Sequence, residues 1–211
     1  MRELVELIRR RGKIGARKDI VKVGFLNQKI DAKLFIRLSE EIGRLFDMRR
    51  ISLIVTSEAS GIPIAAFVAE MYTIPFVFAK KGISTNVNKN DLYLSMVHSH
   101  TFNKDIPLII SRKWIDMIDR VLIVDDVMAN GSCANALVDI VEQAVAKVEG
   151  IVTLMEKKFQ KGGDNLRARG YNVKSLAIIT HIDDDGTLHF EGDEELKGEK
   201  ENGKTKKTVK R

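Results

Sequence analysis

Val121-Leu122-Ile123-Val124-Asp125-Asp126-Val127-Met128-Ala129-Asn130-Gly131-Ser132-Cys133 is the stretch that decides how this chain folds. Its four leading aliphatic residues are typical of a buried strand. Asp125 and Asp126 follow at the end of that strand, and a short loop with Asn130 and Gly131 leads into an apolar-periodic helix. Backbone N–H groups at such a loop can hold a phosphate, and the nearby carboxylates can accept hydrogen bonds from sugar hydroxyls. The segment therefore predicts a site for a ligand that carries both a phosphate and a ribose diol.

One other interpretation of this segment stays open from its residues alone. In an ordinary strand–turn–helix unit the two Asp side chains would only cap the helix. A nicotinamide-binding fold is disfavoured, because no Gly-x-Gly-x-x-Gly follows any apolar run of the chain. The choice between a capped helix and a phosphate site therefore depends on the rest of the sequence.

The segment resembles the ribose-phosphate signature of the type I phosphoribosyltransferases. The resemblance implies 5-phosphoribosyl-1-diphosphate as the ligand, with its ribose hydroxyls on Asp125 and Asp126. Many members carry Thr at both ends of the phosphate loop, whereas the loop here is similar to that of the xanthine phosphoribosyltransferases. Backbone donors survive that difference, so phosphate binding is still expected. The residues that would hold the 5′-phosphate are Ala129, Asn130, Gly131, Ser132 and Cys133.

Length and composition indicate one soluble domain. The 211 residues are enough for a well-packed α/β core, and 44% hydrophobic with 30% charged residues is ordinary for a globular protein. No apolar run approaches the length of a membrane span, and the N-terminus has no signal-peptide core. The single cysteine excludes an internal disulfide framework, so a reducing cytoplasm is the expected compartment.

The net charge of +6 is concentrated at the C-terminus. Lys204–Arg211 carries five basic residues and no acidic one, which leaves the rest of the chain nearly neutral. Such a run is typical of a solvated end, so partners among nucleic acids or membranes are disfavoured. We expect a single domain over residues 1–191 and a disordered basic tail over residues 192–211.

Helical and strand patterns alternate along most of the chain, which predicts an α/β fold with a mostly parallel central sheet flanked by helices. Asp31 is the expected N-cap of a long amphipathic helix, and Asp183–Gly186 is a hairpin turn signal. The resemblance adds a small N-terminal hood and a mobile lid loop. The expected helices cover 3–10, 31–47, 62–71, 134–146 and 164–168, and the expected strands cover 20–23, 51–56, 75–79, 107–111, 121–124, 150–155 and 173–180.

A second anion-binding loop is predicted where the strand at 51–56 meets the next helix. It offers Ser hydroxyls and a glycine that lets the backbone approach a ligand closely. A capped helix start is the alternative for this segment alone. In a phosphoribosyltransferase this loop binds the diphosphate group. The matching residues are Glu58, Ala59, Ser60 and Gly61.

The polar segment from Lys80 to Asp105 has little periodicity, which predicts a long irregular loop. The resemblance makes it a lid that closes over the diphosphate, with Lys80 and Lys81 neutralising charge on the leaving group as catalytic residues. His98 and His100 lie in the same segment, but no further Cys or His supports a metal site there.

Two short segments resemble the purine site of the xanthine enzymes. Lys157 follows a strand and matches the lysine that contacts the base, and Asn27 would hydrogen-bond the base. Ile20 or Val21 would help to cover it. A lysine donor suits the carbonyls and the anionic form of xanthine and leaves the exocyclic amine of adenine unmatched. Guanine and hypoxanthine stay open, because both keep the 6-oxo group.

The resemblance implies a purine salvage enzyme, in which a purine nitrogen displaces diphosphate from 5-phosphoribosyl-1-diphosphate. Mg²⁺ is the expected cofactor and would be held mainly by the substrate oxygens. A homodimer is the usual assembly of the family. Two alternatives are an adenine enzyme and a regulator on the same fold that senses the sugar diphosphate without turning it over.

Overall fold

The chain is described by a computed structural model over residues 1–15, 20–82, 88–99 and 104–193. The strands are β1 (Lys13–Ile14), β2 (Val21–Lys22), β3 (Leu53–Ser57), β4 (Phe76–Lys81), β5 (Leu92–Ser99), β6 (Lys104–Ser111), β7 (Arg120–Met128), β8 (Lys147–Lys157), β9 (Val173–Ile182) and β10 (Leu188–Phe190). The α-helices are α1 (Arg2–Arg11), α2 (Gly24–Asn27), α3 (Ala32–Leu45), α4 (Ile62–Tyr72), α5 (Ser132–Gln143) and α6 (Gly162–Ala168).

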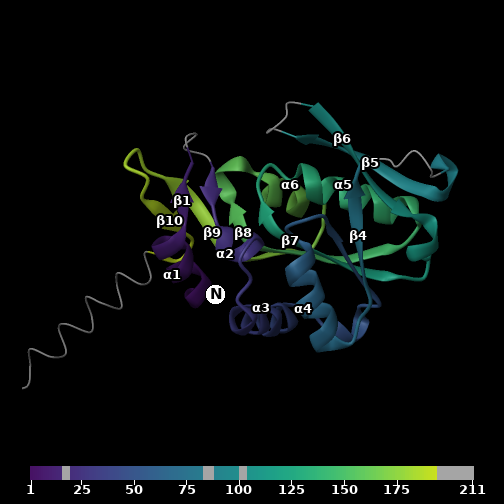
Figure 1. Ribbon diagram of the computed structural model, residues 1–211, viewed down its shortest axis with the longest axis horizontal. Coiled ribbons are helices and arrows are strands. Elements are labelled where there is room, and N and C mark those ends of the chain that lie inside the picture. Colours follow the sequence, from purple (N-terminus) through teal and green to yellow (C-terminus); the bar gives the residue numbers. More distant parts are fainter. Residues whose placement is uncertain (16–19, 83–87, 100–103, 194–211) are drawn as a thin grey trace, which may run out of the picture.

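One large sheet organises the described residues, with its strands in the order β10-β9-β8-β7-β3-β4-β6-β5. The strands from β4 to β9 in that order are parallel, and the outer pairs are antiparallel. Helices α3 and α4 cover one face, and α5 and α6 cover the other (Figure 1). The predicted α/β fold with a mostly parallel sheet is confirmed.

Two hydrophobic clusters fill the space between the sheet and its helices, one on each face. Neighbouring residues of β7 alternate between them, since Leu122 and Val124 join one cluster and Val121 and Ile123 join the other. All four side chains are fully buried. This arrangement explains why the strand is a continuous aliphatic run, because a parallel strand covered on both faces has no polar side.

Local signals place the helices as expected. The Asp31 carboxylate accepts hydrogen bonds from the backbone N–H groups of Lys33 (3.0 Å) and Leu34 (3.3 Å), so it is the N-cap of α3. The hairpin between β9 and β10 turns at Asp183–Gly186, where the N–H of Gly186 donates to the carbonyl of Asp183. Both features were predicted from the sequence.

The prediction of an irregular loop over residues 80–105 was wrong for most of its described part. Lys80 and Lys81 belong to β4, and β5 pairs with β6 from Leu92–Ser111 to Ser99–Lys104. The stretch from Leu92 to Val97 is mostly apolar, which is a local strand signal that the loop prediction missed, and β6 supplies its antiparallel hydrogen-bond partners. Residues 83–87 and 100–103, with His100, lie outside the described residues.

The hood consists of α1, the small sheet of β1 and β2, and α2, and it lies at the β9–β10 end of the large sheet (Figure 1). The described C-terminus is attached to it. Arg9 lies over the ring of Phe190, 5.0 Å from its centroid, and forms an ion pair with Asp193. The tail beyond Asp193 lies outside the described residues, so the domain boundary at residue 191 stays a prediction. Within the described residues, no helix is both long and apolar enough to cross a membrane.

Candidate active site

The acidic pair lies within β7, because the strand continues through Asp125 and Asp126 to Met128 instead of ending before them. Each Asp exposes 6% of its surface, and the N–H of Asp126 donates to Oδ1 of Asp125 at 2.9 Å. Burial, with the neighbouring charge of Asp126 adding to it, raises the pKa of Asp125 to about 8. Asp125 therefore keeps its proton in the unliganded site at neutral pH, and a ligand that brings hydrogen-bond donors or cations would favour its charged form.

The loop after β3 lies directly against this pair. A Cβ at Gly61 would come within 2.1 Å of Thr56 Oγ1 and 2.9 Å of Asp125 Oδ1, so only glycine allows the approach. The Glu58 carboxylate accepts the N–H of Lys81 at 2.5 Å, which links the loop to β4. The peptide between Glu58 and Ala59 is cis. The two loops predicted to bind anions are thus brought together at one edge of the sheet.

The phosphate-type loop continues into α5, whose N-cap is Gly131 with a φ of 83°. The Asn130 side chain accepts the N–H of Ser132 at 3.0 Å, and the next N–H groups of the first turn have no partner within the helix. A cavity of about 70 Å³ lies inside the loop. Its lining residues are Asp125, Val127, Met128, Ala129, Asn130, Gly131, Ser132, Cys133, Ala134 and Thr153.

Backbone contacts from α6 support this loop. The N–H of Gly162 donates to the carbonyl of Ala129 at 3.1 Å, and a Cβ at Gly162 would come within 2.4 Å of that oxygen and of Gly131 N. Sequence reasoning did not identify this support. The adjacent pair Gly162-Gly163 at the start of a helix was the available signal, because such a pair is costly in a helix unless another chain segment approaches closely.

A buried ion pair holds α6 in place, and sequence reasoning missed it as well. Glu156 in β8 has no solvent exposure, and both of its oxygens bind Arg167, at 2.9 and 2.6 Å. The Ser175 hydroxyl donates to the same carboxylate at 2.5 Å. The bidentate contact with Glu156 raises the pKa of Arg167, so the guanidinium stays charged.

The residues expected to bind the base come from the hood and from the end of β8. The Asn27 amide donates to Asp126 Oδ2 at 3.0 Å, so the hood reaches the acidic pair. Lys157 is the last residue of β8 and is buried. Val21 packs into the core, whereas Ile20 is exposed.

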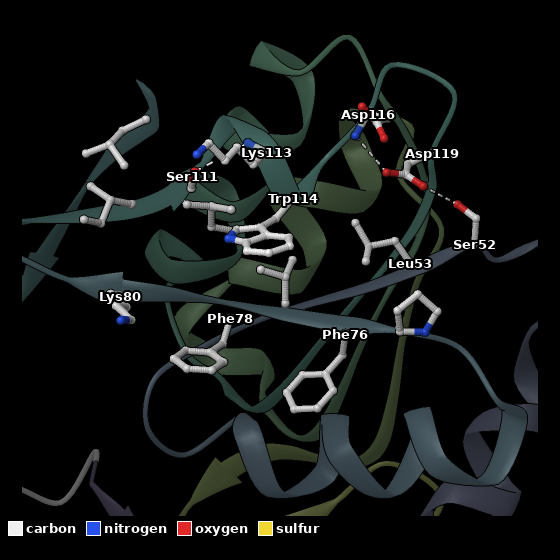
Figure 2. A pocket seen from close by; sticks show the side chains of 15 residues that line it. Ser52, Leu53, Phe76, Phe78, Lys80, Ser111, Lys113, Trp114, Asp116 and Asp119 are labelled. Carbon is white, nitrogen blue, oxygen red and sulfur yellow. Dashed lines mark hydrogen bonds between the residues drawn. The ribbon is translucent and has the colours of Figure 1, made fainter. Parts of the chain in front are cut away.

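Lys80 and Lys81 were predicted to act together, but their side chains lie in different places because the two residues are consecutive in β4. Successive side chains of a strand point to opposite faces. Burial raises the pKa of the Cys133 thiol in the phosphate-type loop, and the charge of Lys81 lies close enough to offset a small part of that rise. Lys80 instead lines a separate cavity with Phe76 and Phe78 (Figure 2).

That cavity measures about 830 Å³ and lies over β3, β4 and β6. Trp114 stands on one side of β4, whereas the rings of Phe76 and Phe78 project from the other side of the strand (Figure 2). The Ser52 hydroxyl donates to Asp119 at the rim of the cavity. None of the residues that line it belongs to the acidic pair or to either anion-type loop. The larger cavity is therefore separate from the predicted phosphate and ribose site.

Cys133 connects the two loops. Its thiol donates to Ser57 Oγ at 3.2 Å. Burial raises the pKa of the thiol well above its usual value, and the nearby charge of Asp125 adds to the rise. A thiol held neutral is a poor nucleophile, so Cys133 serves here as a hydrogen-bond donor.

Comparison with known proteins gives a consistent result. No protein-family model matches the chain. A xanthine phosphoribosyltransferase of Lachnoclostridium phytofermentans is 40% identical over 92% of this chain and 100% of that protein. One of Bifidobacterium animalis subsp. lactis is 41% identical over 90% of this chain and 99% of that protein.

Solved structures are similar in fold. The adenine phosphoribosyltransferase of Thermoanaerobacter pseudethanolicus matches with a TM-score of 0.69 and 26% identity, over 84% of this chain and 98% of that one. The adenine phosphoribosyltransferase of Saccharomyces cerevisiae matches with a TM-score of 0.69 and 21% identity, over 83% of this chain and 99% of that one. At this identity the match supports the fold alone. From the identity and coverage of these relatives, this chain belongs to the xanthine phosphoribosyltransferases, within the type I phosphoribosyltransferase fold.

Proposed function

We propose that this chain transfers the phosphoribosyl group of 5-phosphoribosyl-1-diphosphate to xanthine, giving xanthosine 5′-monophosphate and diphosphate. The observation that carries the proposal is the meeting of two anion-type loops on one buried acidic pair, with Gly61 lying against Asp125. A ligand with a phosphate at one end, a diphosphate at the other and a ribose between them matches that arrangement. The names of the relatives supply the base.

Each part of the site has a role in this reaction. The loop at 129–133 would hold the 5′-phosphate on its N–H groups, and the loop at 58–61 would hold the diphosphate. Asp125 and Asp126 would bind the ribose hydroxyls while positive charge develops at the anomeric carbon. Lys81 would offset charge on the departing diphosphate. Catalysis is then mainly positioning and charge stabilisation in a site with little water.

Magnesium is the cofactor that fits the donor set of this site. Carboxylate oxygens suit a hard cation, and a cation on the substrate would offset the burial and the neighbouring Asp126 charge that together raise the pKa of Asp125. The nearby donors on the protein are Asp125, Asp126 and Glu58. The metal would neutralise charge on the diphosphate, and the protein would position the complex through its loops.

Preference among bases is proposed to depend on Lys157. A cationic donor at the end of β8 favours a carbonyl or an anionic base over an amine. Replacing it should lower kcat/KM for xanthine by roughly ten- to a thousandfold, the effect of one charged hydrogen bond lost from a buried site. Binding of the sugar diphosphate should change much less, because its loops lie on β3 and β7.

The decisive experiment measures diphosphate release with xanthine, guanine, hypoxanthine and adenine, for the wild type and Lys157→Ala. Lys158→Ala is the matched control, since Lys158 is the next residue and pairs with Glu191 at the surface at 2.8 Å. Selective loss of xanthine activity in Lys157→Ala alone supports the proposal. If adenine is the best substrate, the chain is an adenine phosphoribosyltransferase instead. If the chain binds 5-phosphoribosyl-1-diphosphate but turns over none of the bases, a sensing regulator is favoured.

A homodimer is proposed with the face around the large cavity as its interface. Trp114, Met117 and Ile118 expose 64%, 69% and 84% of their surface there, an apolar cluster that a second copy would cover. Trp114 is the single tryptophan of the chain, so its emission reports on this face directly. A blue shift that appears with the dimer in light scattering supports this face, and a dimer with unchanged emission places the interface elsewhere.

A closing lid over residues 80–105 also remains a proposal, now built on the β5–β6 hairpin. Amide hydrogen exchange in β5 should slow when Mg²⁺ and 5-phosphoribosyl-1-diphosphate are added together. Equal exchange with and without the ligand would show that the hairpin does not close.

A further inference from the structure

The hairpin of β9 and β10 carries two histidines opposite each other. His181 and His189 are direct partners in the strand register, and their rings stack with centroids 4.0 Å apart and 8° between their planes. The Asp183 carboxylate lies beside both rings, with Oδ2 2.7 Å from His189 Nε2 and Oδ1 3.6 Å from His181 Nε2. One atom from each of these three residues lies within 4.8 Å of the others.

A hydrogen-bond chain determines which nitrogen of His181 carries its proton. The Thr180 hydroxyl donates its only hydrogen to the carbonyl of His189 at 3.2 Å. The same oxygen lies 3.2 Å from His181 Nδ1, so it can only accept from an N–H there. The lone pair of His181 is then on Nε2, which is the nitrogen that faces Asp183. An oriented imidazole with its second nitrogen hydrogen-bonded is the arrangement found at metal sites.

We propose that this hairpin binds one divalent transition-metal ion of the Zn²⁺ class through His181 Nε2, His189 Nε2 and the Asp183 carboxylate. Bonds of about 2.0 Å in a tetrahedral site place ligand atoms roughly 3.3 Å apart, close to the present 3.6 Å. The shorter contact to His189 lengthens when the ion replaces the proton between the two groups. The fourth position stays open to water.

The chemistry of the donors selects this class of ion over the Mg²⁺ expected at the active site. Imidazole nitrogen suits Zn²⁺, Cu²⁺ and Ni²⁺, whereas Mg²⁺ prefers oxygen alone. Asp184 and Asp185 follow in the turn and add negative potential. Asp185 accepts the N–H of Thr187 at 2.9 Å, so it already serves the turn and is not counted as a ligand.

A metal here would join the edge strand β10 to β9. The hairpin also contacts the hood, since Gly186 lies beside Ile14 and Phe190 packs under Arg9. Amides from Ile182 to Phe190 should therefore exchange more slowly with the metal bound. This readout does not depend on catalysis.

The test is titration of the full-length, chelator-treated chain with Zn²⁺ alone, by competition against a chromophoric chelator. We expect one Zn²⁺ per chain, no competition from Mg²⁺, and at least a tenfold loss of affinity in His181→Gln and in His189→Gln. Thr180→Val should weaken binding by roughly ten- to a hundredfold through the orientation of His181. The three substituted side chains lie on one hairpin, and unchanged melting without metal verifies that the variants are folded.

Two controls make the outcome decisive. His98 pairs with a carboxylate, Asp105, at 2.9 Å, so His98→Gln removes a histidine–carboxylate pair elsewhere and should leave affinity unchanged. Cys133→Ser removes the single thiol that could take the metal. Absence of saturable binding overturns the proposal. So does binding that survives the His181→Gln/His189→Gln double variant or is abolished by either control.

Discussion

Asp125 in β7 and Glu156 in the neighbouring strand β8 are both buried carboxylates, yet the protein treats them in opposite ways. Glu156 is bound by Arg167 on both oxygens and by Ser175, so the fold itself neutralises it. Burial, with the neighbouring Asp126 carboxylate adding to it, raises the pKa of Asp125 to about 8. The difference separates a carboxylate that holds the structure together from one whose charge is left for a ligand to compensate.

The strongest test of this distinction removes the charge of the acidic pair. Asp125→Asn with Asp126→Asn should preserve the fold and lower turnover at least about a hundredfold, on the order of 3 kcal/mol of transition-state stabilisation. The reason is that neutral amides cannot stabilise positive charge at the ribose. Steady-state diphosphate release and a melting curve measure the two properties separately. Near-normal turnover in the folded variant would remove the pair from the reaction.

The opposite result is expected for the β8 carboxylate. Arg167→Ala leaves Glu156 buried without its cation and should lower the free energy of unfolding by about 3 kcal/mol. This is the lower end of the expected range, because a third of the Arg167 side chain, 33%, is exposed. Urea denaturation measures the change.

Arg169→Ala is the matched control for that variant. Arg169 lies two residues further on, stacks on Tyr171 and binds Asn135 at the surface, so its loss should cost under about 1 kcal/mol. Equal losses for the two variants would contradict the structural role of the ion pair.

The pH dependence of stability sharpens the comparison further. A raised pKa means that the proton of Asp125 stabilises the fold fully below its unfolded value near 3.8, and this contribution is lost as the pH rises through about 8. Asp125→Asn keeps a neutral group at every pH. Relative to wild type, the free energy of unfolding of this variant should rise by about 2 kcal/mol between about pH 5 and pH 8. The change is smaller than a fully independent Asp125 would give, because Asp126 shares the proton. Denaturation of both proteins at pH 5 and at pH 8 measures this change. If the difference between their unfolding free energies is the same at both pH values, Asp125 is already charged at pH 5.

The smallest effect is expected for charges that stay in water. Truncation after Asp193 should leave turnover and melting temperature unchanged. Truncation after Phe190 also removes the exposed Lys158–Glu191 pair and the Asp193 contact to Arg9, and should cost under about 1 kcal/mol. A large loss in the shorter removal would show that residues 194–211 contact the folded domain or a second copy.

Sequence patterns within single strands, helices and turns were sufficient to predict much of the fold. The aliphatic run of β7, the Asp31 cap and the Asp183–Gly186 turn each depend on residues close in sequence. The acidic pair and both anion-type loops could be predicted for the same reason. Proximity of Gly61 to Asp125 then followed from parallel strands that end at one edge of the sheet.

Features that depend on partners far along the chain could not be predicted. Glu156 carries no local signal of its ion pair, because its partner Arg167 comes from another element. The mostly apolar run from Leu92 to Val97 in β5, by contrast, was a local strand signal that the loop prediction missed. The separation of Lys80 from Lys81 required knowing that β4 continues through both. The run Gly-x-x-x-x-Gly-Lys-Thr at residues 198–205 matches the P-loop pattern in sequence. It lies outside the described residues, and no aliphatic strand pattern precedes it.

The main-chain contacts between Gly162 and the 129–131 loop determine which substitutions the site can accumulate. Because Gly162 touches the loop through backbone atoms, and phosphate would be bound by N–H groups, the loop side chains contribute little to recognition. In a library of random variants, Ala129 and Ser132 should therefore accept many replacements. Gly131, with its positive φ, and Gly162, with no space for a Cβ, should accept almost none. Evolution can alter the chemical surface of this loop freely, but only while its backbone path is preserved.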